Sequence, residues 1–279
     1  MADDPSGLDN PFAAFFQDPL YLEFKNHLYN YRLRRRKVRK ELLKLENPQL
    51  ILEIGSGVST MTEGGDGIIF SDISWEAVRH LKEKKIARRA LVMSVTDIAL
   101  KSESIPAIVC SEVIEHVKDD QKALQEMYRV LEPGGSLILT VPVHPRYFAY
   151  DDHYVKHERR YAVWPFLKKL RRIGFKNLHM VKVTGFLDKI TMIALAAAYS
   201  VFADPKTDRP PQKAGLFLKM LLPVYKILNW IYSRIVRLEA RLMPLSTSAV
   251  VLIHCTKAGN PMEVSRQKDF GEEVRPKAV

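Results

Sequence analysis

The stretch ILEIGSGVST, residues 51–60, decides how this chain folds. An apolar run contains one acid, Glu53, and ends in two glycines that lie one residue apart, Gly55 and Gly57. A short continuous apolar run is typical of a buried β-strand, and glycine directly after a strand lets the backbone turn sharply and approach a ligand closely. The stretch therefore predicts a strand followed by a ligand-binding turn.

Apolar runs and amphipathic segments alternate along the chain on the C-terminal side of this turn. Helices are predicted for residues 74–85, with Ser74 as the N-cap, and for residues 119–131, ended by Pro133 and the glycines after it. Because strands alternate with helices and are apolar on both faces, we predict an α/β fold with a doubly wound, mostly parallel, seven-stranded sheet. The predicted strands lie within residues 49–55, 67–74, 90–97, 107–117, 136–143, 179–186 and 249–257.

The glycine turn alone does not select the ligand, because dinucleotides and S-adenosylmethionine are both bound by such turns. A dinucleotide site favours a third glycine three residues after the second, and this position is Thr60. The methyl-transfer version often has a third glycine two residues after the second, and this position is Ser59. Both alternatives stay open at this point of the chain.

A second stretch is more specific. Residues 111–142, SEVIEHVKDDQKALQEMYRVLEPGGSLILTVP, contain a strand end, a Glu-His turn at residues 115–116, a helix, Leu-x-Pro-Gly-Gly at residues 131–135, and another strand. This order resembles the class I S-adenosylmethionine-dependent methyltransferases, the type 11 group in particular. The resemblance covers roughly residues 50–180, and residues 249–257 are similar to the last strand of that fold. It implies a Rossmann-like methyltransferase fold with S-adenosyl-L-methionine as the cofactor.

The resemblance also implies which residues meet the cofactor. In the family the glycine motif lies against the methionine part, an acid after the second strand binds the ribose, and a pair after the third strand meets the adenine. The end of the fourth strand lines the same pocket. The matching positions, which we take as cofactor-binding candidates, are Glu53, Gly55, Gly57, Asp72, Ile73, Asp97, Ile98 and Ser111.

Three positions depart from the family pattern. Ser59 replaces a glycine, the stretch from Gly55 to Asp72 is about one helical turn shorter than usual, and Pro106 stands where the family commonly has an aspartate. These departures are the basis of an alternative, a methyltransferase-like protein that has lost activity and serves as a binding or scaffolding protein. A third alternative, a nicotinamide-dependent oxidoreductase, is disfavoured by the Leu-x-Pro-Gly-Gly segment and by Thr60.

The candidate acceptor side is residues 151–175, because many members of the family have a His-x-Arg-x-Tyr segment here, followed by a helix. His157 or His153 could act as the base that takes a proton from the acceptor, since histidine titrates near neutral pH. Tyr161 completes the set of catalytic candidates. Arg159 and Arg160 could hold an anionic acceptor, because guanidinium pairs well with carboxylate or phosphate. No metal site is expected.

The formal net charge is +11, and much of it is clustered between residues 32 and 44. Such a cluster attracts the phosphates of nucleic acid, anionic lipid or a phosphorylated substrate. Nucleic acid is disfavoured, because no recognised module or aromatic platform accompanies the charge. The basic residues are Arg32, Arg34, Arg35, Arg36, Lys37, Arg39, Lys40 and Lys44.

The two cysteines and the N-terminus bear on the cellular compartment. Cys110 and Cys255 lie in apolar stretches, which predicts buried reduced thiols. The acidic N-terminus lacks the pattern of a secretory signal. We therefore expect a cytoplasmic protein that can lie peripherally on the inner face of a membrane.

A helical insertion is expected before the last strand. Its first apolar run, residues 190–203, is shorter than the roughly 20 residues that span a bilayer. In the second segment, residues 215–243, five cations fall in one narrow sector of a helical wheel. This pattern suits a helix in a membrane interface, and a lid packed on the domain or on a second subunit is the alternative. The five cations are Lys219, Lys226, Arg234, Arg237 and Arg241.

These observations combine into one prediction for the whole chain. Residues 1–47 form a basic N-terminal helical segment, with a helix over residues 12–46 that ends before Pro48. Residues 48–185 and 246–258 form the methyltransferase core, residues 186–245 the helical insertion, and residues 259–279 a flexible tail. We expect methyl transfer to a small apolar or lipid-linked acceptor, with an anionic membrane surface as a further partner. The oligomeric state is left open.

Overall fold

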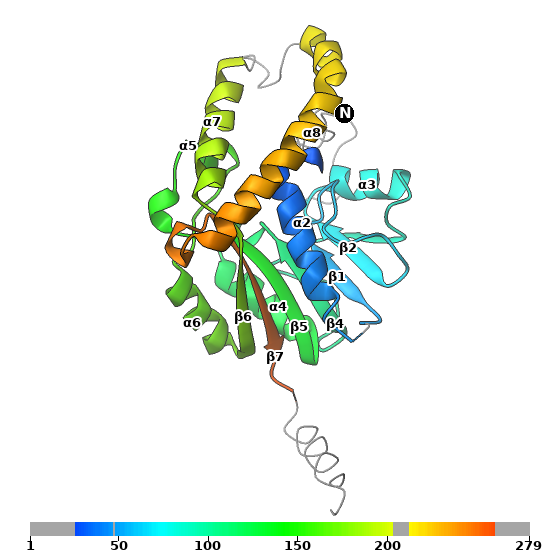
Figure 1. Cartoon of the computed structure of the whole chain (residues 1–279). Helices are drawn as coiled ribbons and strands as arrows, with labels where there is room; N and C mark the ends of the chain where they lie inside the picture. Colours follow the sequence, from blue (N-terminus) through cyan, green and yellow to red (C-terminus); the bar gives the residue numbers. More distant parts are fainter. Residues whose placement is uncertain (1–25, 47, 203–211, 260–279) are drawn as a thin grey trace, which may run out of the picture.

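A single seven-stranded β-sheet forms the centre of the protein (Figure 1). The computed structural model describes residues 26–46, 48–202 and 212–259. The strand order is β3-β2-β1-β4-β5-β7-β6, and β7 runs opposite to the other six strands of this sheet. The predicted doubly wound, mostly parallel, seven-stranded sheet is therefore confirmed. The strands are β1 (Ile51–Ile54), β2 (Ile68–Asp72), β3 (Arg89–Val92), β4 (Ile105–Ser111), β5 (Leu131–Pro142), β6 (Phe175–Thr184) and β7 (Val250–Lys257).

Helices cover both faces of the sheet. The helices α4 (Asp120–Val130) and α6 (Val163–Ile173) pack on one face, and α2 (Tyr29–Leu42) and α8 (Gln212–Leu242) pack on the other. The remaining helices are α3 (Trp75–Glu83), α5 (Tyr150–Tyr154) and α7 (Phe186–Phe202), together with the 3₁₀ turns η2 (Ile114–His116), η3 (Pro145–Tyr147) and η4 (Leu245–Thr247).

Strand β4 shows why the two layers form. Successive side chains of a strand point to opposite faces, so an all-apolar strand needs cover on both sides. Ile108 and Cys110 join the apolar cluster under α4 and α6, whereas Val109 between them joins the cluster under α2 and α8. All three side chains are fully buried. Cys110 and Cys255 are buried free thiols, as predicted.

Local capping fixes where the helices begin. Ser74 accepts a hydrogen bond from the backbone N–H of Ala77 at 3.2 Å, which confirms it as the N-cap of α3. Asp119 accepts one from Lys122 at 2.9 Å and caps α4 in the same way. Because β2 and β4 both run parallel to β1, the turns that follow them lie at the same edge of the sheet.

Two helices, α7 and α8, connect β6 to β7 (Figure 1). They project beyond the edge of the sheet at which β1 and β4 end, and α8 returns across α2 and β6. Within the described part of the chain, no helix combines the length and the apolar character needed to cross a lipid bilayer.

Part of the predicted organisation lies outside the described residues. This applies to the predicted helix before residue 26, to the tail from residue 260 onward and to the side chain of Lys219. The predicted boundaries at residues 47, 185 and 245 stay predictions.

Candidate active site

The site lies where β1 and β4 end side by side. Connections from these two neighbouring strands leave in opposite directions, which makes this edge the switch point of the sheet. In doubly wound sheets ligands bind in the crevice beyond the carboxyl ends of the strands at this point. Gly55, Asp72 and Ser111 end or follow the strands β1, β2 and β4 here, so the structure brings the main cofactor-binding candidates to one edge.

The backbone favours glycine at both positions of the turn after β1, and the space around Gly55 requires it there. Gly55 has φ +67° and Gly57 has φ +55°, in the left-handed region that is unfavourable for residues with a Cβ. A Cβ on Gly55 would also lie 2.2 Å from Cγ2 of Val113, which follows β4. The turn after β1 therefore packs directly against the turn after β4, with no room for a side chain between them.

Asp72 ties the glycine turn to the start of α3. One carboxylate oxygen accepts the backbone N–H of Gly57 at 2.8 Å, and the other accepts that of Ser74 at 2.9 Å. Each oxygen of a carboxylate can accept more than one hydrogen bond, so this arrangement is compatible with ribose hydroxyls as further donors. Ile73, the next candidate, is half-buried beside it.

Glu53 binds the part of the same loop that lies further along the chain than the glycines. Its buried carboxylate accepts backbone N–H groups from Met61 at 2.7 Å and from Thr62 at 2.9 Å, and it also accepts the Thr62 hydroxyl. Burial raises the pKa of Glu53 to about 7, although these hydrogen bonds act in the opposite direction. From α2, the hydroxyl of Tyr31 donates to the carbonyl of Thr60 at 2.8 Å. The contacts that Glu53 makes are therefore with the loop itself.

The predicted adenine-side residues lie on a loop that α4 holds in place. Asp97 is exposed, and Ile98 is buried with its backbone N–H donated to Glu126 at 2.9 Å. Arg129 donates back to the Ile98 carbonyl at 2.8 Å and pairs with Glu126. At the end of β4, the Ser111 hydroxyl lies 2.7 Å from the hydroxyl of Thr140. The cofactor role of all these residues stays a prediction.

The three catalytic candidates differ in their surroundings. Nδ1 of His157 lies 2.7 Å from Oδ1 of Asp152, and its Nε2 lies 3.8 Å from Oε1 of Glu115. His153 is exposed, and its ring meets the edge of Phe148 with the centroids 4.9 Å apart. The structure therefore places His157 in a charged cluster and His153 outside it.

The hydroxyl of Tyr161 is already hydrogen-bonded within the protein. It contacts the carbonyl of Ile114 at 3.1 Å and Oδ2 of Asp120 at 3.0 Å, and burial together with Asp120 holds the pKa of Tyr161 well above its usual range. These contacts tie the segment after α5 to the turn after β4 and to the start of α4. The geometry gives no support to a catalytic role for Tyr161.

The two arginines of this segment also bind internal carboxylates. Arg160 pairs with Asp152 at 2.7 Å and with Asp151 at 3.5 Å, and Arg159 lies 3.4 Å from Asp120. Lys189 of α7 joins the same network at 2.5 Å from Asp151. The network connects the acceptor-side segment to the base of α7, so neither arginine presents its whole charge to an acceptor.

Sequence reasoning missed two carboxylates on the turn after β4. Glu112 has φ +55° and pairs with Arg34 of α2 at 2.9 Å. Glu115 is fully buried, and neither of its carboxylate oxygens has a hydrogen-bond partner among the described residues. Burial and the nearby charge of Glu112 hold the pKa of Glu115 well above its usual range. The Glu-His turn in the sequence drew attention to Glu115, but it did not predict that the side chain of Glu115 is buried.

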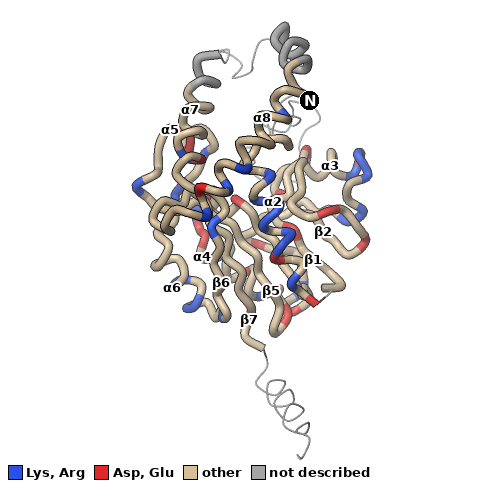
Figure 2. The backbone as a smooth tube through the Cα atoms, in the orientation of Figure 1, with Lys and Arg blue, Asp and Glu red and all other residues tan. Residues whose placement is uncertain are grey.

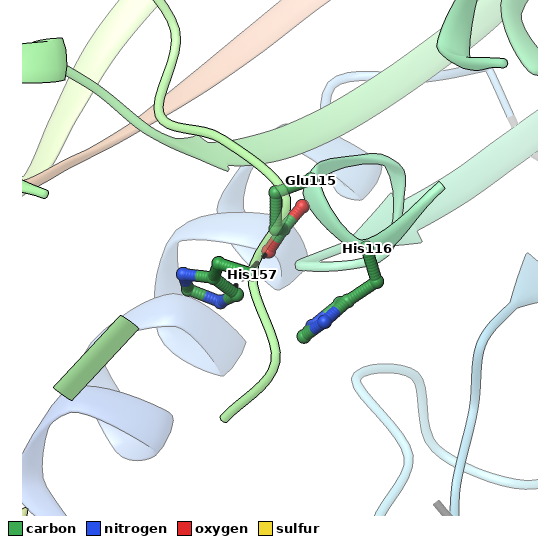
Figure 3. Close-up of side chains that lie close together, drawn as sticks. All are labelled: Glu115, His116 and His157. Carbon is green, nitrogen blue, oxygen red and sulfur yellow. Dashed lines mark ion pairs between the residues drawn. The ribbon is translucent and has the colours of Figure 1, made fainter. Parts of the chain in front are cut away.

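The carboxylate of Glu115 points toward two imidazole rings, those of His116 and His157 (Figure 3). The ring centroids of the two histidines are 4.7 Å apart. The ligand atoms of these three residues all lie within 4.8 Å of one another. The turn after β4 supplies two of them, and the segment after α5 supplies the third.

A basic groove of about 980 Å³ lies between α2 and α8, above β6. Figure 2 marks the Lys and Arg positions along the backbones of these two helices. Among the described residues that line the groove, Glu41 is the one acid, and its carboxylate pairs with Lys44 at 2.7 Å. Burial and neighbouring cations lower the pKa of Lys37 and that of Arg237, as expected where like charges are crowded together. The cations that line the groove are Arg36, Lys37, Lys40, Lys44, Lys182, Arg234, Arg237 and Arg241.

In a comparison with known protein families, residues 52–139 match a methyltransferase domain family. Among curated proteins, the chain is 24% identical over 146 residues to 2-methyl-6-phytyl-1,4-hydroquinone methyltransferase 2 of Oryza sativa, which covers 48% of this chain and 40% of that protein. It is 28% identical over 106 residues to the ubiquinone/menaquinone biosynthesis C-methyltransferase UbiE of Pectobacterium carotovorum, covering 33% and 41%. The chain thus spans about two fifths of the length of these relatives.

Solved structures share the fold. A methyltransferase of Thermotoga maritima superposes with a TM-score of 0.54 at 17% identity, over 88% of this chain and 99% of that one. A phosphoethanolamine N-methyltransferase of Haemonchus contortus, in complex with S-adenosyl-L-methionine, superposes with a TM-score of 0.53 at 14% identity, over 91% and 61%. At these identities the likeness is one of fold.

Proposed function

Because residues 52–139 form a class I S-adenosylmethionine-dependent methyltransferase domain of the type 11 group, we propose that this chain transfers a methyl group to a small apolar or lipid-linked acceptor. One observation carries the proposal. The strained glycine turn, the carboxylate of Asp72 and the end of β4 converge on the switch point of the sheet.

Each candidate residue has a place in this proposal. The left-handed turn at Gly55 and Gly57 lets the backbone lie against the methionine part of S-adenosylmethionine, which supplies the activated methyl group. Asp72 accepts the ribose hydroxyls, Asp97 and Ile98 meet the adenine, and Ser111 lines the pocket beside the turn. Methyl transfer is an in-line displacement, so what the protein contributes is alignment and the exclusion of water.

An apolar acceptor is proposed for two reasons. The curated relatives named above methylate quinone-type compounds, according to their names. Helices α7 and α8, which project beyond the same edge of the sheet, carry exposed large apolar side chains, among them Ile190, Leu195 and Ile227 at 49%, 45% and 59% exposure. An apolar acceptor could approach the site along such a surface.

The three faces of α8 support contact with a membrane surface. One sector packs on the protein through Leu222, Val236 and Ala240. A second sector carries the cations of the basic groove. A third sector, roughly 120° wide at 100° per residue, is apolar and exposed. It contains Leu221, Val224, Ile227, Leu228, Ile231, Ile235, Leu238 and Leu242.

An apolar face beside a row of cations is the arrangement of a helix that lies in a membrane interface. Arg234 stacks on Trp230 beside the other cations, with its guanidinium 3.9 Å from the ring centroid. Each cation near an anionic leaflet contributes up to ~1 kcal/mol of attraction. We therefore propose a peripheral position on an anionic membrane, such as the inner face of a cell membrane, in preference to a lid that is packed on the domain.

Calorimetric titration with S-adenosylmethionine and its demethylated product tests the cofactor site. We expect micromolar binding that Asp72→Asn weakens at least tenfold, because one acceptor oxygen for the ribose hydroxyls is lost. Asp66→Asn is the matched control, since Asp66 pairs with Arg88 at an exposed place outside the site. Equal affinity of Asp72→Asn and the wild-type protein would remove Asp72 from the cofactor site.

The same titration separates the alternatives. A folded sample that binds neither cofactor form would favour the inactive scaffold, and binding of a nicotinamide dinucleotide would favour an oxidoreductase. With cofactor binding established, transfer of a labelled methyl group to a hydroquinone in detergent micelles tests the acceptor class. A water-soluble catechol is the comparison that tests whether the apolar part of the acceptor matters.

A further inference from the structure

Three potential metal ligands meet beside the glycine turn, although they come from two separate parts of the chain. Glu115 and His116 lie on η2 after β4, and His157 lies on the segment after α5 (Figure 3). The backbone joins the two parts, because the N–H of Glu158 donates to the carbonyl of Glu115 at 2.9 Å. Their ligand atoms lie within 4.8 Å of one another.

Both imidazoles are anchored through the same ring nitrogen. Nδ1 of His157 lies 2.7 Å from Asp152, and Nδ1 of His116 lies 3.1 Å from the carbonyl of Lys156. An Nδ1–H donated to oxygen fixes the tautomer in which Nε2 carries the lone pair. Histidines that bind metal almost always have such an outer partner, either a carboxylate or a backbone carbonyl.

Asp152 is itself held rigidly. It accepts Nε of Arg160 at 2.7 Å, Nζ of Lys189 at 2.8 Å and the backbone N–H of Ala149 at 3.0 Å. With three other donors, the carboxylate stays ionised and cannot turn away from His157. The orientation of the His157 ring is thus determined by a buried network.

Glu115 supplies the independent indication of a ligand. Its side chain is 0% exposed, and neither oxygen has a hydrogen-bond partner in the described part of the chain. An unpartnered buried carboxyl group is unfavourable, since buried charges are normally paired or coordinate metals. Among the three side chains drawn in Figure 3, the carboxylate points toward the two imidazoles.

We propose that Glu115, His116 and His157 bind a divalent first-row transition-metal ion. Two imidazoles and one carboxylate are the ligands of catalytic zinc sites and of open iron sites, whereas Mg²⁺ and Ca²⁺ prefer oxygen ligands throughout. Three protein ligands leave at least one coordination position open.

Metal binding requires these ligand atoms to move closer together. Donor atoms about 2.1 Å from a tetrahedral metal ion lie roughly 3.4 Å apart, so a pair at the upper limit of 4.8 Å has to close by roughly 1.4 Å. Nε2 of His157 and Oε1 of Glu115, at 3.8 Å, have to close by roughly 0.4 Å. Rotation of the Glu115 side chain, which no hydrogen bond from the described residues holds, supplies part of this movement.

The place of the site suggests what the open position takes. Glu115 follows Val113, the residue that packs against Gly55, by two positions. The metal would therefore lie next to the proposed methyl donor, and an oxygen of the acceptor could complete its coordination. A bound hydroxyl would have a lowered pKa and would release its proton to water. The oxygen would then form a bond to the methyl carbon as the sulfur–methyl bond breaks, with the demethylated cofactor as the leaving group. This second step rests on the proposed function, and the metal site itself does not.

Titration of tag-free, metal-free protein with Co²⁺ tests the site, because the visible absorption of bound Co²⁺ reports the ligands directly. We expect one equivalent to bind, a rise in melting temperature on binding, and at least tenfold weaker binding in Glu115→Gln, His116→Ala and His157→Ala. His80→Ala on α3 removes an imidazole outside the cluster and is the matched control. Far-UV circular dichroism shows whether each variant is folded.

The result that would overturn the proposal is a folded wild-type protein without a Co²⁺ spectrum, or an unchanged spectrum in Glu115→Gln and His116→Ala. His116→Ala is decisive if His157→Ala fails to fold, because Nδ1 of His116 contacts a backbone carbonyl, that of Lys156, whereas Nδ1 of His157 contacts the buried Asp152. The titration contains neither cofactor nor acceptor, so its outcome is independent of the proposed methyl transfer. Failure to bind S-adenosylmethionine would leave the metal site standing.

Discussion

Glu53 precedes the glycine turn by one residue and is buried, yet it is an acid. Burial raises its pKa from 4.5 to about 7. Between about pH 4.5 and 7 the Glu53 carboxyl is protonated in the folded protein and ionised in the unfolded chain. The stability that Glu53 contributes is therefore fully present below about pH 4.5 and is lost as the pH rises through 7. The free energy of unfolding falls by at most about 3 kcal/mol over this range.

The pH dependence of Glu53→Gln tests this assignment. Because the amide does not titrate, we expect the difference in unfolding free energy between wild type and variant to change between pH 5 and 8, with the wild type losing more stability. Denaturant unfolding at several pH values measures this difference. A constant difference over that range would show that Glu53 is ionised throughout, with the donors of Met61 and Thr62 outweighing burial.

Gly55 offers a second prediction at the scale of one residue. Gly55→Ala adds a Cβ at φ +67°, which costs about 1–2 kcal/mol, and drives it against Val113, which adds about 1–3 kcal/mol. Gly65→Ala is the matched control, since nothing lies within 4 Å of a Cβ there. We expect a clear fall in melting temperature for Gly55→Ala alone.

Removal of Cγ2 in the double variant Gly55→Ala/Val113→Ala should restore part of the lost stability. If the double variant is no more stable than Gly55→Ala, the strain lies in the backbone and not in the contact. The need for glycine at residue 55 was visible in the sequence, because it directly follows a strand. The partner that excludes a side chain, 58 positions later on the turn after β4, was not.

At the scale of elements, α8 combines a feature that the sequence predicts with one that it does not. The wheel of residues 215–243 predicts that the cations share a sector, and Arg234, Arg237 and Arg241 do line one groove. A wheel does not tell which of the apolar residues face the protein. Packing on α2 and β6 decides this, so Val236 is buried while Ile235 beside it is 49% exposed.

The exposed apolar face of α8 leads to a prediction about membrane binding. We expect Ile227→Gln/Ile231→Gln/Leu238→Gln to weaken binding to lipid vesicles strongly, because each half-exposed side chain loses about 1 kcal/mol of burial. Folding should be unaffected, since these side chains are already 45–59% exposed. The control Leu43→Gln/Ile86→Gln/Leu91→Gln removes exposed apolar groups that lie outside α8.

Vesicle sedimentation and light scattering together give the outcome. Equal sedimentation of the two triple variants would show that α8 does not enter the membrane. A change from dimer to monomer in the α8 variant, without a change in sedimentation, would mean that a second copy of the chain covers this face.

At the scale of the molecule, the sheet and its helices follow from alternating apolar runs, whereas the joining of distant segments does not. In the sequence, residues 32–44 form one cationic stretch. In the fold, Leu33 and Val38 of α2 are buried, and Arg34 forms an ion pair with Glu112 at the site. The cations of α2 that stay on the surface lie beside those of α8. Likewise, Glu115 and His157 are far apart in the chain, and only the fold of the segment after α5 brings them together.

The basic groove is therefore a property of the whole molecule, and its charge gives the last prediction. Neutralising one cation from each wall, Lys37→Gln and Arg237→Gln, should cost about 2 kcal/mol of binding to anionic vesicles, or roughly thirtyfold in affinity. Lys82→Gln/Lys101→Gln lowers the net charge equally outside the groove and should have a smaller effect. Wild-type binding should weaken between ~0.05 and ~0.5 M salt, because the Debye length falls below ~10 Å. Identical losses in both double variants would show that net charge, and not the groove between α2 and α8, attracts the membrane.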